Sequence, residues 1–309
     1  MPPCIRHARS DCAMKTNYHT HTDFCDGRDS PEAMVRAALD RRFDIIGFSA
    51  HSLYPFAAEW HLPPRRFREY AACIAALSQA YRGRIAILTG YEADFLPPFS
   101  CPDKTAYAAL GAEYLIGSVH YLAADGLCDT PDGTVRCGSV GGNAGWFCVD
   151  AGAEEVTNGV QALFGGDGKK TVQAYFARVR EMLRTCDFDI VGHIDVVRKR
   201  NGALRFFDER EGWYRGELEA TAKEAARQGV IVEINTGGIA RKAIDDVYPS
   251  ADFLRLLRAY GVPVMINSDA HAAADIDCAF GLAAQRARDA GYRATAYLEG
   301  GTVKETPLA

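Results

Sequence analysis

Seven short apolar segments recur along this chain of 309 residues, and longer segments with helical spacing separate them. Such alternation predicts parallel strands joined by crossover helices rather than separate α and β blocks. The expected strands are residues 15–20, 44–49, 84–90, 113–119, 188–192, 230–235 and 263–268. Seven units of this kind favour an α/β barrel, and an open doubly wound sheet is the alternative that the pattern leaves open.

The segments between the strands carry helix signals. Ser30 is a favoured N-cap residue, Pro31 suits the first helical position, and Glu32 places an acid in the first turn. Apolar residues then follow at helical spacing, so a helix is expected to begin at residue 31. Further helices are expected at residues 64–80, 171–184, 213–228, 250–259 and 273–290.

One segment departs from this repeat. Residues 123–170 are rich in glycine and aspartate and are much longer than a usual βα loop. Long loops in compact domains commonly serve as lids or binding loops. Because no linker, internal repeat or low-complexity block is present, residues 14–309 are expected to form a single domain, preceded by an N-terminal extension at residues 1–13.

Composition narrows the class of protein. The formal net charge of −5 disfavours a nucleic-acid partner, because neutralising a phosphate backbone requires a basic surface. We find no long apolar run of the kind that spans a membrane and no secretory h-region, so a cytoplasmic location is expected. The ten cysteines show no C-x-x-C spacing, which predicts free thiols.

Histidines and selected carboxylates gather where the predicted strands end. Because the carboxyl ends of the strands in a parallel barrel meet on one face, these side chains should share one cavity. Six of the eight histidines belong to this set. Its members are His19, His21, His51, Glu92, His120, His193, Asp269 and His271.

Imidazole and carboxylate groups are the ligands expected for zinc, iron or manganese. Any one of these histidines could equally be a satisfied buried imidazole, but that explanation fails for six histidines and two acids at successive strand ends. A cluster of this size can hold two or three ions, as phosphoryl transfer requires. His7 and His61 have no such placement, and His61 is only a minor candidate for substrate contact.

Six segments resemble, in the right order, the PHP superfamily of phosphoesterases. They are HTHTDFCDG (19–27), AHS (50–52), GYEADF (90–95), GSVHYL (117–122), IVGHID (190–195) and NSDAH (267–271). The resemblance implies a distorted seven-stranded (β/α)7 TIM-like barrel, the PHP fold, with a trinuclear metal centre. It assigns His19, His21, Glu92 and Asp269 to one metal, Glu92, His120 and His193 to a second, and Asp26, His51 and His271 to a third.

Within the superfamily, three further stretches are similar to the histidinol-phosphatase family: residues 61–85, 162–176 and 233–250. This similarity implies hydrolysis of L-histidinol phosphate in histidine biosynthesis, and it makes Arg198 and Arg241 the candidates for binding the substrate phosphate. A guanidinium suits this role because it offers a charged, bidentate fork. The alternatives are a PHP phosphoesterase for another small phosphate ester, a nuclease, which the acidic composition disfavours, and a metal-binding protein without turnover.

Two positions depart from the superfamily pattern. Asp26 stands where many relatives carry histidine, and Ala50 stands before His51 where many carry aspartate. We expect the first change to alter the occupancy or metal preference of the third site. The second removes an acid that would orient a ligand or face the substrate. Oligomeric state is not determined by these patterns.

Overall fold

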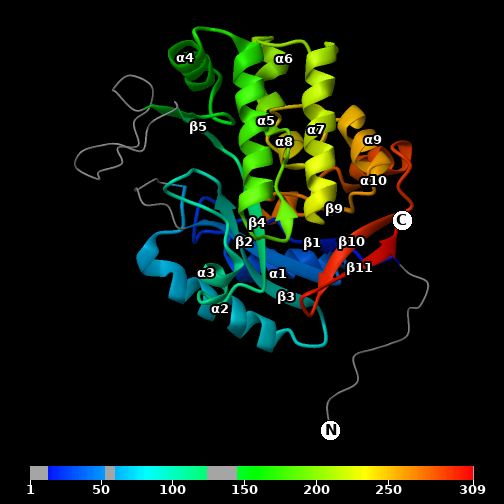
Figure 1. The fold of residues 1–309 in the computed structure, drawn as a ribbon. Coiled ribbons are helices and arrows are strands. Elements are labelled where there is room, and N and C mark those ends of the chain that lie inside the picture. Colours follow the sequence, from blue (N-terminus) through cyan, green and yellow to red (C-terminus); the bar gives the residue numbers. More distant parts are fainter. Residues whose placement is uncertain (1–12, 53–59, 124–144, 309) are drawn as a thin grey trace.

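The computed structural model describes residues 13–52, 60–123 and 145–308, and its centre is a seven-stranded parallel sheet curled into a barrel (Figure 1). The strands follow one another around the barrel in chain order. They are β1 (Thr16–Asn17), β2 (Ile45–Ser52), β3 (Ala86–Asp94), β4 (Tyr114–Ser118), β7 (Ile190–Val191), β8 (Ile231–Asn235) and β9 (Val264–Asn267). All seven predicted strands are therefore confirmed.

The barrel is distorted where its first and last strands meet. A single parallel bridge joins Thr20 to Ala270, beyond the ends of β1 and β9. Closer to the strands, side-chain amides take the place of the backbone hydrogen bonds that usually join neighbouring strands. The Tyr18 N–H donates to Asn267 Oδ1 (2.8 Å), and the Ser268 N–H donates to Asn17 Oδ1 (3.2 Å). The barrel thus closes, which excludes the open doubly wound sheet.

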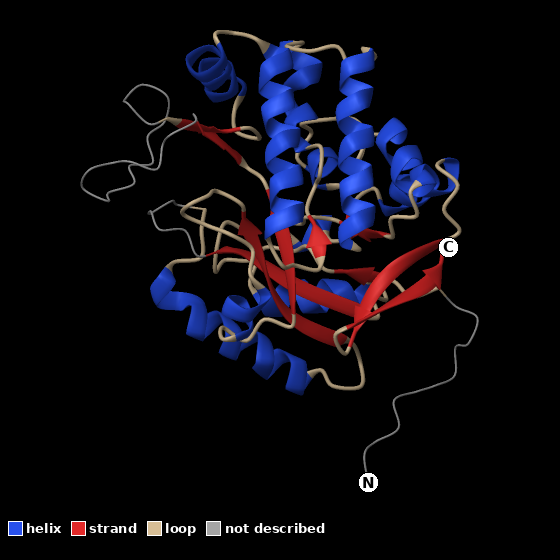
Figure 2. Ribbon diagram, in the orientation of Figure 1, coloured by secondary structure: helices blue, strands red, loops and turns tan. Residues whose placement is uncertain are grey.

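Helices surround the strands on the outside of the barrel (Figure 2). They are α1 (Pro31–Asp40), α2 (Phe67–Ala80), α3 (Lys104–Ala108), α4 (Ala153–Phe164), α5 (Gly168–Thr185), α6 (Asn201–Leu204), α7 (Gly212–Gln228), α8 (Gly237–Ala240), α9 (Ala251–Ala259) and α10 (Phe280–Asp289). The Ser30 side chain caps α1 as expected, accepting a hydrogen bond from the Ala33 N–H. Within the described residues, no helix combines the length and apolar character needed to cross a membrane.

Two expectations about local structure were wrong. Residues 273–290 are not one helix, because Ala279 adopts a left-handed conformation that separates the turn Ala273–Asp275 from α10. Residues 123–170 are not one long loop either. They include β6 (Trp146–Cys148), which pairs antiparallel with β5 (Tyr121–Ala123), and the helix α4; residues 124–144 lie outside the described part.

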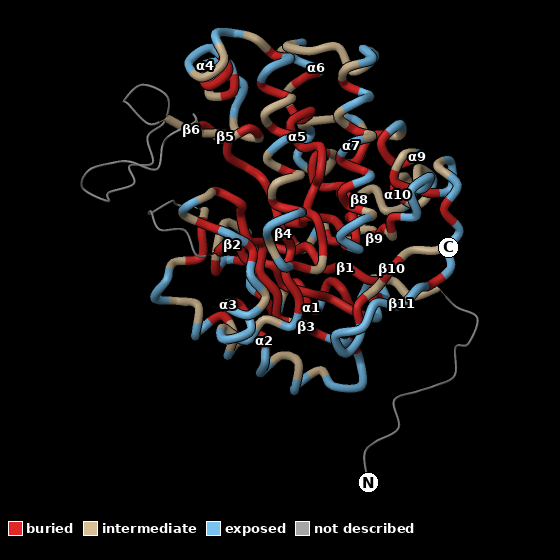
Figure 3. Tube along the Cα trace, in the orientation of Figure 1, coloured by how far each residue is buried: buried red, intermediate tan, exposed pale blue. Residues whose placement is uncertain are grey.

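The lower half of the barrel interior, nearer the amino ends of the strands, is lined by apolar side chains that form an apolar layer. Its side chains come from six of the barrel strands, from Tyr18 directly after β1, and from the first strand of a C-terminal hairpin. The repeat pattern did not predict this hairpin, which consists of β10 (Ala294–Glu299) and β11 (Thr302–Pro307). The Tyr18 hydroxyl donates to Leu298 O (2.7 Å) and so ties the hairpin to the barrel. Figure 3 shows the barrel strands as the buried centre of the molecule, with exposed stretches on the surrounding helices and on β11. The core residues of this layer are Tyr18, Ile45, Tyr114, Ile116, Ile190, Ile231, Met265, Ala296 and Leu298.

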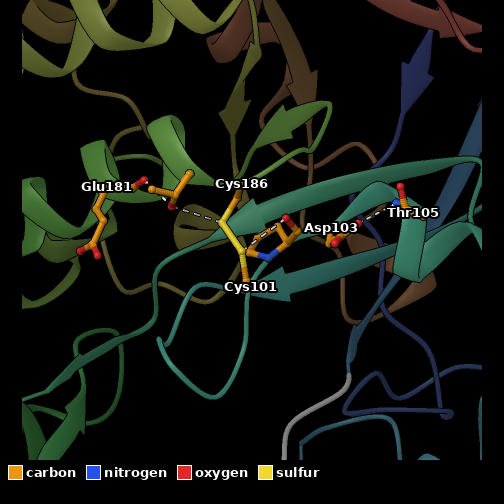
Figure 4. Close-up of a disulfide and its surroundings, with 7 residues drawn as sticks. Cys101, Asp103, Thr105, Glu181 and Cys186 are labelled. Atoms are coloured by element: carbon orange, nitrogen blue, oxygen red, sulfur yellow. Dashed lines mark hydrogen bonds between the residues drawn. A yellow bond between two sulfur atoms is a disulfide. The ribbon is translucent and has the colours of Figure 1, made fainter. Parts of the chain in front are cut away.

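One pair of cysteines corrects the expectation of free thiols. Cys101 and Cys186 form a disulfide that joins two loops 85 residues apart (Figure 4). Beside it, the Lys104 N–H donates to Asp187 O (3.0 Å), so the two loops also share backbone contacts. The pairing depends on tertiary structure, because neither cysteine belongs to a local motif. Four other cysteines in the described part are free: Cys25, Cys73, Cys148 and Cys278.

The substitution Gly90→Ala tests the packing of the apolar layer. A Cβ at Gly90 would overlap the ring of Tyr114, which also covers Gly47. We expect a loss of about 1–3 kcal/mol in the free energy of unfolding, measured by urea denaturation, because the core must shift to relieve the overlap. The control is Gly216→Ala on the exposed face of α7, where no other atom lies within 4 Å of the added Cβ. This variant should gain about 0.5–1 kcal/mol in the free energy of unfolding, because alanine favours a helix more than glycine does. Equal stability of the two variants would contradict this account.

Candidate metal centre and active site

The two-residue period of the strands places the polar cluster directly above the apolar layer. On β3, Leu88 packs against the apolar layer, and Glu92 and Asp94 follow it at even spacing on the same face of the strand. Both carboxylates are almost completely buried. On β2, His51 stands in the same way above Ile45. The upper half of the barrel interior is therefore lined by ionisable side chains.

Glu92 lies at the centre of this cluster. Its Oε2 lies 3.1 Å from His19 Nε2 and 3.0 Å from His51 Nδ1. Its Oε1 lies 3.0 Å from His193 Nε2 and 3.5 Å from His120 Nε2. Because the two carboxylate oxygens face different histidines, this residue can join two ions.

Two aspartates complete the cluster. The distance from His21 Nε2 to Asp269 Oδ1 is 3.3 Å, and that from His271 Nε2 to Asp26 Oδ2 is 3.0 Å. Asp269 has a φ of 50°, a left-handed conformation that costs energy in a residue other than glycine and is typical of functional sites. All nine residues predicted as metal ligands are thus brought together, in four overlapping groups of candidate ligand atoms: His21, Asp26, His51 and His271; His19, Glu92 and His193; His19, His21 and Asp269; and His51, Glu92 and His120.

Two further carboxylates orient the histidines, and the sequence analysis missed them. His19 Nδ1 lies 2.9 Å from Glu233 Oε2, and His120 Nδ1 lies 2.9 Å from Asp94 Oδ1. A ring that donates from Nδ1 keeps a lone pair on Nε2 for a metal. The signal was the strand period itself, since Asp94 stands two residues after Glu92 and Glu233 faces inward on β8.

The electrostatics of the cluster fit metal ligands. Burial, together with the neighbouring His271 and His51, lowers the pKa of His21 to about 3, so this imidazole is neutral. Burial opposes ionisation of Glu92, but His19, His51 and His120 hold its pKa well below the usual range. The buried atoms His21 Nε2 and His193 Nδ1 have no hydrogen-bond partner in the described part of the chain. Orphaned ring nitrogens beside an anionic carboxylate are the donor set that a transition metal takes.

Two cations reach this centre from loops. Arg241 Nη2 lies 2.6 Å from Asp269 Oδ2, and Lys199 Nζ lies 2.8 Å from Asp150 Oδ2. Arg198 is placed differently from the expectation. Its Nε donates to Glu209 Oε2 (2.7 Å), its Nη1 lies 3.4 Å from Asp195, and it is absent from the described residues that line the cavity.

A cavity of about 450 Å³ opens onto the metal-ligand cluster. Its lining combines three kinds of side chain: the ligand cluster, the two cations, and a wall of aromatic and acidic residues from β5, β6, α4 and the segments after β2 and β6. His61 is buried against Trp60, with ring centroids 3.9 Å apart, and is not part of the lining. The lining residues are Asp26, His51, Trp60, His120, Tyr121, Trp146, Phe147, Cys148, Asp150, Ala151, Glu155, His193, Lys199, Arg241, Asp269 and His271.

Comparison with known proteins identifies the class. The family model described as "PHP domain" matches residues 17–237, which is more than half of the chain. This chain therefore belongs to the PHP domain family. Its barrel, with buried histidines and acids above an apolar layer, is the fold expected from the resemblance.

Individual relatives cover almost the whole chain. A protein of Deinococcus radiodurans named "probable histidinol-phosphatase" is 29% identical over 285 residues, covering 90% of this chain and 95% of the relative. A solved structure from Listeria monocytogenes matches with a TM-score of 0.72 and 19% identity, over 87% of this chain and 99% of that chain.

A second solved structure comes from Lactococcus lactis. It is histidinol phosphate phosphatase complexed with zinc, L-histidinol and phosphate. It matches with a TM-score of 0.65 and 19% identity, covering 94% of this chain and 98% of that chain. At this identity the likeness establishes the fold that the two proteins share.

The carboxylates behind the histidines should control metal affinity. Asp94→Asn keeps the shape of the side chain but weakens its hold on His120 Nδ1, so metal affinity is expected to fall by about 10–100-fold. Chelator competition with Zn²⁺ or Mn²⁺ measures this directly. Asp103→Asn, at the N-cap of α3, is the matched control and should bind metal as the wild type does. A similar loss in both variants would contradict an orienting role for Asp94.

Proposed function

We propose that this chain is a metal-dependent phosphomonoester hydrolase that converts L-histidinol phosphate to L-histidinol and phosphate. The observation that carries the proposal is the cavity, where a buried cluster of histidines and acids lies beside two cations. The names of the Deinococcus and Lactococcus relatives support the choice of substrate. We also propose that residues 14–309 act as one domain.

The nine clustered residues fit two or three divalent ions of zinc, iron or manganese. His19, His21, Glu92 and Asp269 would hold the first. Glu92, His120 and His193 would hold the second, and Asp26, His51 and His271 the third. When bound, such ions supply a more acidic water and stabilise charge on the phosphate oxygens. Many relatives carry histidine at the position of Asp26, so the third set in this chain has a carboxylate in place of an imidazole.

The chain's own residues then bind and orient the ester. Arg241 and Lys199 neutralise the phosphate charge, because both line the cavity. One carboxylate holds each of them in place, Asp269 for Arg241 and Asp150 for Lys199. Lys199 takes the part that the sequence suggested for Arg198, whose guanidinium is occupied by Asp195 and Glu209. Glu233 and Asp94 hold His19 and His120 in the ring orientation that presents Nε2 to the cluster.

A different small phosphate ester is the second candidate substrate for the same site. A nuclease is less well supported, because its strand-binding channel would require clustered Lys and Arg, whereas four carboxylates line this cavity. A metal-binding protein without turnover would be supported by a closed ligand sphere. The open cavity beside the cluster favours an enzyme.

Phosphate release from L-histidinol phosphate tests the proposal. Protein reconstituted with Mn²⁺ or Zn²⁺ should prefer this ester over a panel of other phosphomonoesters. His120→Ala should abolish the activity, because it removes a ring that faces both Glu92 and His193. Activity confined to other esters would discard the substrate, and no activity with all metals bound would discard the enzyme.

The neighbouring cations Lys199 and Arg198 should differ in their effect on KM when substituted. Lys199→Met is expected to raise KM by about tenfold or more, because it removes a charge that faces the substrate phosphate. It should also lower the melting temperature, because it leaves the buried Asp150 carboxylate unpaired. Arg198→Lys should lower the melting temperature and leave KM nearly unchanged, because it weakens a buried ion pair behind the site. Steady-state kinetics and thermal melts measure both. A raised KM in Arg198→Lys together with an unchanged KM in Lys199→Met would show that Arg198, rather than Lys199, binds the phosphate.

A further inference from the structure

Part of the cavity lining is not used by the phosphate or the metal ligands. Three aromatic side chains form a continuous wall: Trp60 stacks near Tyr121 with ring centroids 6.0 Å apart, and Tyr121 lies 6.5 Å from Trp146. The wall reaches the metal-ligand cluster, because Trp60 meets the ring of His51 edge-on at 4.9 Å. A substrate whose phosphate contacts the cluster would therefore place its alcohol portion against these rings.

The same lining contains one acid whose charge is not balanced. Of the four carboxylates in the cavity, Asp26 and Asp269 lie among the histidines, and Asp150 pairs with Lys199 at 2.8 Å. Glu155 forms no ion pair with any residue that the structure describes. Within the described ranges, its Oε1 accepts one hydrogen bond, from the Cys148 N–H at 3.3 Å. A half-buried carboxylate with a single long hydrogen bond has capacity for a cationic ligand.

Packing around the wall holds these groups in place. Glu155 lies in the first turn of α4, and α4 packs on β6 through Gly159, where any Cβ would overlap the ring of Phe147. Trp146 is supported from behind by Phe99, with ring centroids 5.7 Å apart. The orientation of Glu155 and Trp146 toward the cavity therefore depends on close contacts rather than on free loops.

We propose that this wall makes the enzyme selective for phosphate monoesters whose alcohol carries a positive charge. Glu155 is the counter-ion of that charge, and the rings of Trp60 and Trp146 flank the cationic group, since aromatic faces attract cations. The inference rests on the proposed phosphatase function, because it assigns the end of the substrate that the phosphate-binding residues do not contact. It makes Glu155 a specificity-determining residue.

The test compares Glu155→Gln with Glu154→Gln. Glu154 is the exposed neighbour in the same turn of α4, so the two variants change the net charge equally. Each is assayed with two cationic esters, L-histidinol phosphate and phosphoethanolamine, and with two uncharged-alcohol esters, glycerol phosphate and phenyl phosphate. In Glu155→Gln we expect KM for the cationic esters to rise about tenfold, with kcat nearly unchanged, and KM for the others to stay the same. Glu154→Gln should match the wild type.

Binding of free L-histidinol, measured by calorimetry on the metal-loaded protein, separates this inference from the proposed function. Weaker binding in Glu155→Gln than in Glu154→Gln supports the cation site even if no ester is hydrolysed. An equal rise in KM for both classes of ester would show a merely structural role and overturn the inference. Unchanged kinetics and unchanged histidinol binding in Glu155→Gln would also overturn it.

Discussion

The two-residue period of the parallel strands divides the barrel interior into two layers, and the rest of the molecule depends on that division. Along β3, one face passes from Leu88 and Gly90 to Glu92 and Asp94. The lower layer packs tightly, with Tyr114 lying over the bare backbone of Gly90 and the C-terminal hairpin covering its base. This apolar support keeps the strand ends rigid. The upper layer can then hold charged groups at distances near 3 Å from one another.

Charges buried in this way are stable only as a balanced set, since an unpaired buried ion costs several kcal/mol. Glu92 is surrounded by histidines, and Glu233 is held by His19, Asn235 and Asn267 together. Among the residues that the structure describes, this balance leaves the buried ring nitrogens His21 Nε2 and His193 Nδ1 without hydrogen-bond partners. A site of this kind combines rigid strand ends with ring nitrogens that are available to bind a metal. Such an arrangement can hold metal ions firmly and still leave one side open to a substrate.

The loops decide how such a centre is used. The cluster of histidines and acids comes from strand ends, whereas Lys199 and Arg241 come from the turns after β7 and β8. Two members of the aromatic and acidic wall, Trp146 on β6 and Glu155 on α4, come from the segment that breaks the repeat. The other two rings belong to Trp60, which follows β2, and Tyr121 on β5. Chemistry and selectivity thus belong to different parts of the chain. In the proposed function, the barrel carries the hydrolysis of the phosphate ester, and the inserted segment contributes two of the groups that would select the alcohol.

The sequence by itself determined the seven strands and the clustering of nine histidines and acids, because both depend on local patterns and on the rule that parallel strand ends converge. Glu233 and Asp94 escaped notice, since a carboxylate inside a strand acquires its role only from the histidine that folding places beside it. Only the tertiary structure decided that Lys199 rather than Arg198 lines the cavity, and that Cys101 meets Cys186. Adjacent side chains on a turn point in different directions, and contacts across 85 residues follow from packing, which no local pattern encodes.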